Sequence, residues 1–182
     1  MEIVIAFGIL SLPIIALSLR TLTKLKSHGF YRFFSWEAIL WLFLNNLEYW
    51  FADPFCIRQL IAWFLLFVAL YLIIAGVILL RKFGKPNKNR DGSELYSFEK
   101  TSELIDTGLY KYIRHPLYAS LLYLTWGIFL KQTTFPLFLI SLFSTLFLCL
   151  TAVSDERECL EYFGGKYKEY MKRTNRFIPF IF

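Results

Sequence analysis

The sequence predicts an all-α integral membrane protein, a bundle of five transmembrane helices followed by an amphipathic helix at the membrane surface. Of its 182 residues, 57% are hydrophobic and 20% are aromatic, and the mean hydropathy is +0.48. The apolar residues gather into five runs that approach the length of about 20 residues needed to cross a bilayer. Basic residues gather between these runs. A single membrane domain over residues 1–182 is therefore expected.

The five runs give the expected helices in order. Pro13 is expected to kink the first helix. The second is the most polar: it contains Glu37, and its Asn45, Asn46 and Glu48 are expected to hydrogen-bond between helices. The third is uncharged throughout, and the fourth and fifth form a helical hairpin. The predicted spans are residues 3–19, 35–52, 59–80, 116–130 and 134–153.

The basic residues orient these spans. Eighteen of the twenty lysines and arginines lie in the first loop, the third loop (residues 81–114) and the C-terminal tail. Only Arg58 and Lys131 lie in the other two loops. The positive-inside rule then places the N terminus outside and the C terminus in the cytoplasm. A four-span arrangement without the second span would put the two basic loops on opposite faces, so the charge pattern rejects it.

Composition also excludes several classes of protein. A formal charge of +6 in a membrane protein indicates contact with anionic membrane lipids and no nucleic-acid partner. The three cysteines, Cys56, Cys149 and Cys159, lack metal-ligand spacing, so no metal site is predicted. Nucleotide-binding glycine loops and the motifs of zinc and serine hydrolases are missing from the sequence. Hydrolysis by zinc or serine is therefore unsupported.

Polar and aromatic residues converge at the start of the fourth span. Pro116 suits the first helical position and biases His115 towards the N-cap, where free backbone amides attract anions. Arg114 adds a fixed positive charge. Interfacial anchoring is the alternative role for the arginine and the tyrosines. Three tyrosines offer aromatic faces for an adenine ring or a sulfonium cation: Tyr110, Tyr112 and Tyr118.

Two carboxylates, Asp155 and Glu156, follow the fifth span. The helical hairpin returns the chain to the cytoplasmic face, so we expect these carboxylates and His115 to border one cavity. Carboxylates there suit an ammonium group or ribose hydroxyls, and they are candidates for catalysis. The alternative is a solvated helix start, where acidic residues favour the helix dipole.

The C-terminal tail predicts one amphipathic helix. Leu160, Phe163, Tyr167 and Tyr170 recur three and four residues apart, with lysines on the other face. The pair Gly164-Gly165 would loosen this helix. It is either a wall over the site or a surface anchor. His28, in the first loop, has no partner in the sequence and receives no role.

The order of these features resembles a known family. The run Gly108-x-Tyr110-x3-Arg114-His-Pro-x-Tyr118, a hairpin, Asp155-Glu156 and Phe163-Gly-x2-Tyr167-x2-Tyr170 are similar to the isoprenylcysteine carboxyl methyltransferases. Phospholipid methyltransferases are similar in the same stretch. The resemblance covers residues 102–179, which would form the cofactor-binding core.

The resemblance implies methyl transfer from S-adenosylmethionine to a lipid or lipid-modified acceptor, such as a prenylated one, at the cytoplasmic membrane face. Asp155 and Glu156 would be catalytic, with His115 a further candidate to deprotonate an amine or hydroxyl acceptor. Ser102 and its neighbours map onto the family's cofactor loop. The cofactor-binding residues implied are Glu103, Leu104, Ile105, Tyr110, Arg114, His115, Pro116, Leu117, Tyr118, Asp155, Glu156 and Tyr167.

Two departures from the family bear on the acceptor. The first acid is Asp155 where the family has glutamate. Enzymes that methylate a carboxylate commonly carry an arginine where this chain has Thr151. An arginine there would hold a carboxylate in a bidentate manner. The acceptor group therefore stays open among amine, hydroxyl, thiol and phospholipid headgroup.

Two other functions fit parts of the sequence. Membrane sterol and steroid reductases, which use NADPH, have a similar C-terminal half, but they usually carry asparagine where this chain has Leu117. A non-enzymatic membrane scaffold with an interfacial tail is the third possibility. It predicts that neither S-adenosylmethionine nor NADPH binds.

Overall fold

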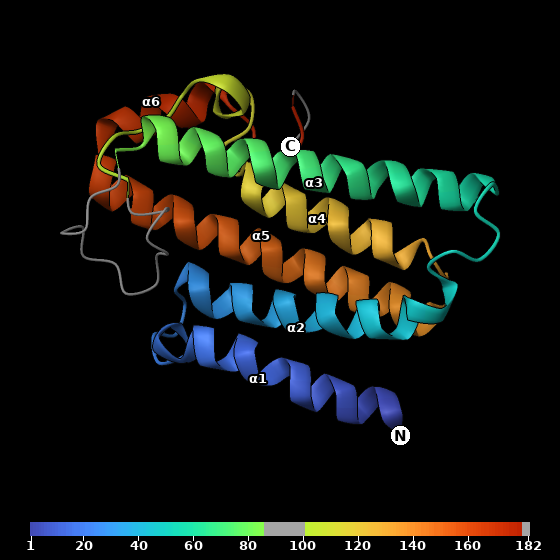
Figure 1. Ribbon diagram of the computed structural model, residues 1–182. Helices are drawn as coiled ribbons and strands as arrows, with labels where there is room; N and C mark the ends of the chain where they lie inside the picture. Colours follow the sequence, from blue (N-terminus) through green and yellow to red (C-terminus); the bar gives the residue numbers. More distant parts are fainter. Residues whose placement is uncertain (86–100, 180–182) are drawn as a thin grey trace.

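The chain folds as a helical bundle (Figure 1). The computed structural model describes residues 1–85 and 101–179. The middle of the predicted third loop, residues 86–100, lies outside the described residues. The described helices are α1 (Glu2–Leu22), α2 (His28–Asn46), the 3-10 helix η1 (Leu47–Tyr49), α3 (Ile57–Phe83), the 3-10 helix η2 (Gly108–Lys111), α4 (Pro116–Phe129), α5 (Phe135–Phe163) and α6 (Gly165–Arg173).

The five long helices lie side by side in the order α1, α2, α5, α4 and α3 (Figure 1). Successive helices run in opposite directions, so the ends of α1, α3 and α5 gather at one end of the bundle with the starts of α2 and α4. The short helix α6 lies at this same end, beyond α5. The arrangement therefore brings the described parts of the basic loops and of the tail together, as the charge pattern predicted.

Three helices, α1, α3 and α5, are long and apolar enough to cross a membrane. The helix α4 is apolar but has only 14 residues, and α2 contains charged side chains. Large apolar side chains on α1 and α3 are exposed, including Val4, Leu12 and Phe64. A surface of this kind is typical of contact with lipid tails rather than water. Membrane insertion of α2 and α4 stays a prediction.

The helices α1 and α3 extend up to three residues beyond the predicted spans, whereas α2 and α5 extend much further, α2 at its start and α5 at its end. The predicted end of the second span at residue 52 is wrong, because α2 ends at Asn46. The helix α2 begins at His28, because the Ser27 hydroxyl accepts a hydrogen bond from the Phe30 amide and caps it. The helix α5 continues to Phe163 and carries Asp155 and Glu156 in its interior. The alternative of a solvated helix start for these acids is therefore wrong, and Glu156 is only 4% exposed.

The predicted amphipathic helix is divided in two. The helix α5 ends at Phe163, and α6 begins at Gly165. Gly164 between them has a φ of +59°, a left-handed conformation that glycine adopts without steric cost. The chain can therefore turn here, and Tyr167 and Tyr170 of α6 are both buried.

Polar side chains in the second helix behave differently from one another. The Ser11 hydroxyl of α1 donates to Glu37 at 2.6 Å, a bond between helices that was not predicted. The predicted bond between helices is wrong for Asn45 and Asn46, whose side-chain amides donate to backbone carbonyls one turn earlier in α2. The competing local bond within the helix accounts for this difference. Glu48 lies in η1 and is exposed.

A buried hydroxyl cluster joins α2, α4 and α5 at the centre of the bundle. The Ser144 hydroxyl lies 3.2 Å from that of Ser35 and 3.1 Å from that of Thr125. All three residues are buried. Hydrogen bonds between membrane helices are usually worth about 0.6 kcal/mol each, and the best reach about 1.7 kcal/mol. The cluster therefore fixes the position of α4 relative to the other two helices.

We expect Ser144→Ala to lower the free energy of unfolding in detergent by about 1 kcal/mol, because it removes two bonds between helices. Thr145→Ala is the matched control, since the bond that the Thr145 hydroxyl makes among the described residues is to the Ser141 carbonyl of its own helix. Thermal or denaturant unfolding of both variants measures the difference. Equal destabilisation would contradict the role of the cluster.

Candidate active site

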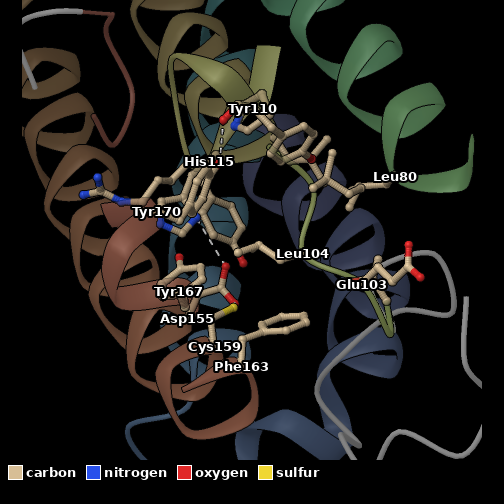
Figure 2. A pocket seen from close by; sticks show the side chains of 16 residues that line it. Leu80, Glu103, Leu104, Tyr110, His115, Asp155, Cys159, Phe163, Tyr167 and Tyr170 are labelled. Carbon is tan, nitrogen blue, oxygen red and sulfur yellow. Dashed lines mark hydrogen bonds and ion pairs between the residues drawn. The ribbon is translucent and has the colours of Figure 1, made fainter. Parts of the chain in front are cut away.

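A cavity opens at the bundle end where α3 and α5 finish and α4 begins (Figure 2). Its space of about 100 Å³ is enough for several water molecules. Figure 2 shows Asp155, Cys159 and Phe163 following one another along α5 on one side, with Leu104 opposite. The lining residues are Leu80, Thr101, Glu103, Leu104, Ile105, Tyr110, Arg114, His115, Pro116, Leu117, Tyr118, Asp155, Cys159, Phe163, Tyr167 and Tyr170.

The start of α4 places histidine at the mouth of this cavity. Pro116 is the first residue of α4 and His115 is the N-cap, as predicted. Upstream, Gly108 has a φ of +60° and packs so closely on α3 that an added Cβ would lie 2.9 Å from the Leu79 side chain. Glycine at this position lets η2 lie against α3, and Tyr110 is thereby buried.

Glu156 is the electrostatic centre of the site. Its carboxylate accepts from Arg114 Nε at 2.9 Å and from Arg176 Nη2 at 3.0 Å. The Glu156 and Arg114 side chains are only 5% and 9% exposed. A buried carboxylate requires such partners, because desolvation of an unpaired charge is costly. Glu156 therefore ties the loop before α4 and the C-terminal segment to α5.

His115 lies between the two acids of α5. Its Nδ1 is 3.3 Å from Asp155 Oδ2, and its Nε2 is 3.5 Å from Glu156 Oε1. Its ring stacks on Tyr118 with the ring centroids 5.4 Å apart. Burial lowers the pKa of His115, but the hydrogen bonds and negative charges of both acids outweigh burial and raise it above 6.5. The charged imidazolium is thus stabilised relative to that of an isolated histidine.

The C-terminal segment is hydrogen-bonded to the loop that carries His115. The Arg114 amide donates to the Asn175 carbonyl at 2.7 Å, and the His115 amide donates to the Arg176 carbonyl at 3.1 Å. The first of these bonds and the bond from the Asn175 amide to the Tyr112 carbonyl, at 3.0 Å, form an isolated parallel bridge between Ile113 and Asn175. Arg114 Nη1 also donates to the Thr174 carbonyl. The tail is therefore an integral part of the site.

Two tyrosines of α6 complete the wall. The Tyr170 hydroxyl donates to the Tyr110 carbonyl at 2.6 Å and so holds η2 (Figure 2). Tyr167 is 3% exposed and lines the cavity. Burial raises the pKa of Tyr167, so its hydroxyl stays protonated. Of the two roles considered for this part of the tail, the geometry supports a wall.

The structure brings together the residues that the sequence singled out. All of the predicted cofactor-binding residues except Glu156 line the cavity, and Glu156 lies next to it against His115. Five lining residues were not among the predicted cofactor-binding residues. Phe163 and Tyr170 had been expected in a helix that forms either a wall over the site or a surface anchor. Cys159 was overlooked although it lies four residues after Asp155, whereas Leu80 and Thr101 carry no such signal. Sequence reasoning also missed Arg176, which had been counted only as a basic residue of the tail.

We expect Glu156→Gln to destabilise the protein by about 3–5 kcal/mol, because it leaves Arg114 buried without a compensating charge. Thermal unfolding in detergent measures the change. Glu161→Gln, at an exposed position of the same helix, is the matched control and should change stability little. An equally small effect at position 156 would contradict the central role of this carboxylate.

The raised pKa of His115 predicts a pH dependence of stability. Its ion pairs stabilise the fold fully below pH 6.5, and this contribution is lost as the pH rises through the higher pKa of the folded state. The difference in unfolding temperature between the parent protein and His115→Gln should therefore be largest at acidic pH and shrink at alkaline pH. A difference that grows with pH would contradict the assigned charge state.

Known proteins match parts of this chain. The methanethiol S-methyltransferase of Pseudomonas deceptionensis is 31% identical over 71 residues, which are 39% of this chain and 26% of the relative. The methanethiol S-methyltransferase 1 of Bradyrhizobium diazoefficiens is 28% identical over 71 residues, 39% of this chain and 24% of the relative. The matched part thus spans about a quarter of these relatives. No solved structure matches the chain significantly.

These relatives confirm the resemblance to membrane methyltransferases that the motifs indicated. A family model described as a protein of unknown function (DUF1295) matches residues 11–174, most of the chain. The protein therefore belongs to the DUF1295 family.

Proposed function

We propose that this protein is an S-adenosylmethionine-dependent methyltransferase of the membrane, with the cavity beside α4 and α5 as its active site. The observation that carries the proposal is the buried pairing of His115 with Asp155 inside a cavity walled by tyrosines. The names of the two matched relatives and the order of motifs support the same class of reaction.

The residues around the cavity fit the chemical groups of this cofactor. Asp155 and Glu103 provide carboxylates for an ammonium group and for ribose hydroxyls. Tyr118 provides an aromatic face for the adenine ring or the sulfonium. The amino-terminal end of α4 favours a carboxylate. When bound, S-adenosylmethionine would supply a methyl group activated by the sulfonium charge.

The electrostatics of the cavity favour an uncharged methyl acceptor. Arg114 and His115 are the basic side chains among the described residues that line the cavity, and both face the acids of α5. Arg114 also donates to the Met171 and Thr174 carbonyls, so its donors are occupied. Thr151 bonds to the Phe147 carbonyl within α5 and does not replace the missing arginine. A carboxylate acceptor would therefore lack a cationic partner.

A thiol is the acceptor group that the relatives' names favour. An apolar or lipid-like thiol would reach the site from the bilayer, because the bundle presents apolar side chains on its outer surface. The concentration of basic residues at this end of the bundle supports a cytoplasmic site. The membrane would thus deliver the acceptor, and the cytoplasm would deliver the cofactor.

Cofactor choice is tested by the unfolding temperature of the purified protein in detergent. We expect S-adenosylhomocysteine to raise it and NADPH to leave it unchanged, because a ligand that binds only the folded state stabilises it. At a concentration of about 100 times the dissociation constant the gain is about 2.7 kcal/mol. Stabilisation by NADPH alone would favour a reductase, and stabilisation by neither would favour a scaffold.

Tyr118 is tested by calorimetric titration of Tyr118→Leu with S-adenosylmethionine and S-adenosylhomocysteine. We expect the affinity for the cationic cofactor to fall about tenfold, and that for the neutral product to fall less, because leucine lacks the negative aromatic face. Tyr112→Leu is the matched control, since Tyr112 lies in the segment before α4, outside the cavity lining, and is 46% exposed. Unchanged affinity of Tyr118→Leu for both ligands would contradict the assignment.

A further inference from the structure

A second histidine lies near Asp155, outside the lining of the cavity. His28, at the start of α2, is fully buried, and its Nδ1 lies 2.6 Å from Glu158 Oε2. The His28 backbone amide donates to the other oxygen of Glu158 at 3.1 Å. A ring nitrogen of His28 and one carboxylate oxygen each of Asp155 and Glu158 lie within 4.8 Å of one another. A single water molecule can bridge such a gap.

These three side chains connect the cavity to solvent through a buried histidine. Asp155 lines the cavity, His28 is closed off from solvent, and the side chain of Glu158 is 33% exposed. His28 Nε2 is buried and has no hydrogen-bond partner among the described residues. A neutral imidazole that donates from Nδ1 carries a free lone pair on Nε2. His28 is therefore equipped to accept a proton on one nitrogen and release one from the other.

The route through His115 does not lead to solvent in the same way. His115 contacts Glu156, whose side chain is 5% exposed and already accepts hydrogen bonds from two arginines. A proton passed to Glu156 would break both ion pairs, at a large cost in free energy. Glu158, by contrast, pairs with His28 and reaches solvent.

We propose that His28 and Glu158 form a proton relay that carries the proton of the methyl acceptor from Asp155 to water. This inference rests on the proposed function, since an uncharged thiol must lose its proton when it is methylated. A lone pair of the acceptor sulfur forms the new bond to the methyl carbon. The bond between that carbon and the sulfonium sulfur breaks, and its electron pair stays on the departing sulfur.

The acceptor proton goes to Asp155 in this step and leaves through His28 and Glu158. The charged groups that face His28 are Asp155 and Glu158 of α5 and Arg32 of its own helix. Burial and Arg32 lower the pKa of His28, but the hydrogen bond to Glu158 and the two negative charges outweigh them and raise it. The protonated form of His28 is therefore stabilised relative to that of an isolated histidine.

The relay is tested by two acceptors that differ in thiol pKa. One is an alkyl thiol, which is protonated at neutral pH, and the other is an electron-poor aromatic thiol, which is largely ionised. We expect His28→Gln and Glu158→Gln to lower kcat for the alkyl thiol by about tenfold or more, because transfer of the proton is impaired. For the ionised thiol, kcat should stay within about twofold of the parent enzyme, since no proton has to leave.

The controls separate a relay from a purely structural pair. Glu161→Gln removes an exposed carboxylate of the same helix and should leave both rates unchanged. The affinity for S-adenosylhomocysteine, measured by calorimetry, should be retained in His28→Gln and Glu158→Gln. If one of these two variants fails to fold, the other still gives the comparison of acceptors.

Three results would overturn the relay. Equal loss of kcat for both thiols, or no loss for either, would show that the pair only anchors α2 to α5. Loss of parent activity on addition of EDTA would instead make these three residues a metal site. If the parent enzyme binds S-adenosylhomocysteine and methylates thiols, any of these three results contradicts the relay alone and leaves the proposed function in place. Absence of both binding and methylation would sink the proposed function with it.

Discussion

The site depends on one buried carboxylate. Glu156 of α5 accepts hydrogen bonds from Arg114, which precedes α4, and from Arg176, which follows α6. Three segments distant in the sequence thus meet on a single side chain. His115 follows Arg114 in the chain, so the ion pair between Arg114 and Glu156 also places His115 next to Asp155. A structural ion pair thus positions the two residues that are proposed to take part in the reaction.

This arrangement gives the two adjacent acids of α5 different environments. Glu156 is enclosed by cations and stays ionised as an anchor, whereas Asp155 lines the cavity and contacts one histidine. Adjacent residues on a helix point in different directions, so one can face the interior of the bundle and the other the cavity. Catalysis by Asp155 and anchoring by Glu156 is therefore a sharper proposal than the shared catalytic role that the sequence suggested.

The sequence predicted much of this because strong local signals coincide with the site. Pro116 predicted where α4 begins, and the charge pattern predicted that this start lies at the same end of the bundle as the end of α5. The contacts of His28 and Arg176 could not be predicted, since they join residues 130 and 20 positions apart. The end of the fifth apolar run was also a poor guide to the end of α5, because buried ion pairs allow that helix to continue with charged residues.

We propose that the cofactor occupies the cavity between the start of α4 and the end of α5. The native cysteines test it directly, because Cys159 lines this cavity and Cys56 precedes α3 at the opposite end of the bundle. Alkylation rates can be followed for each thiol by mass spectrometry with and without S-adenosylhomocysteine. Selective slowing at Cys159 is the predicted result. Unchanged alkylation of Cys159 at a ligand concentration that saturates binding would contradict the claim.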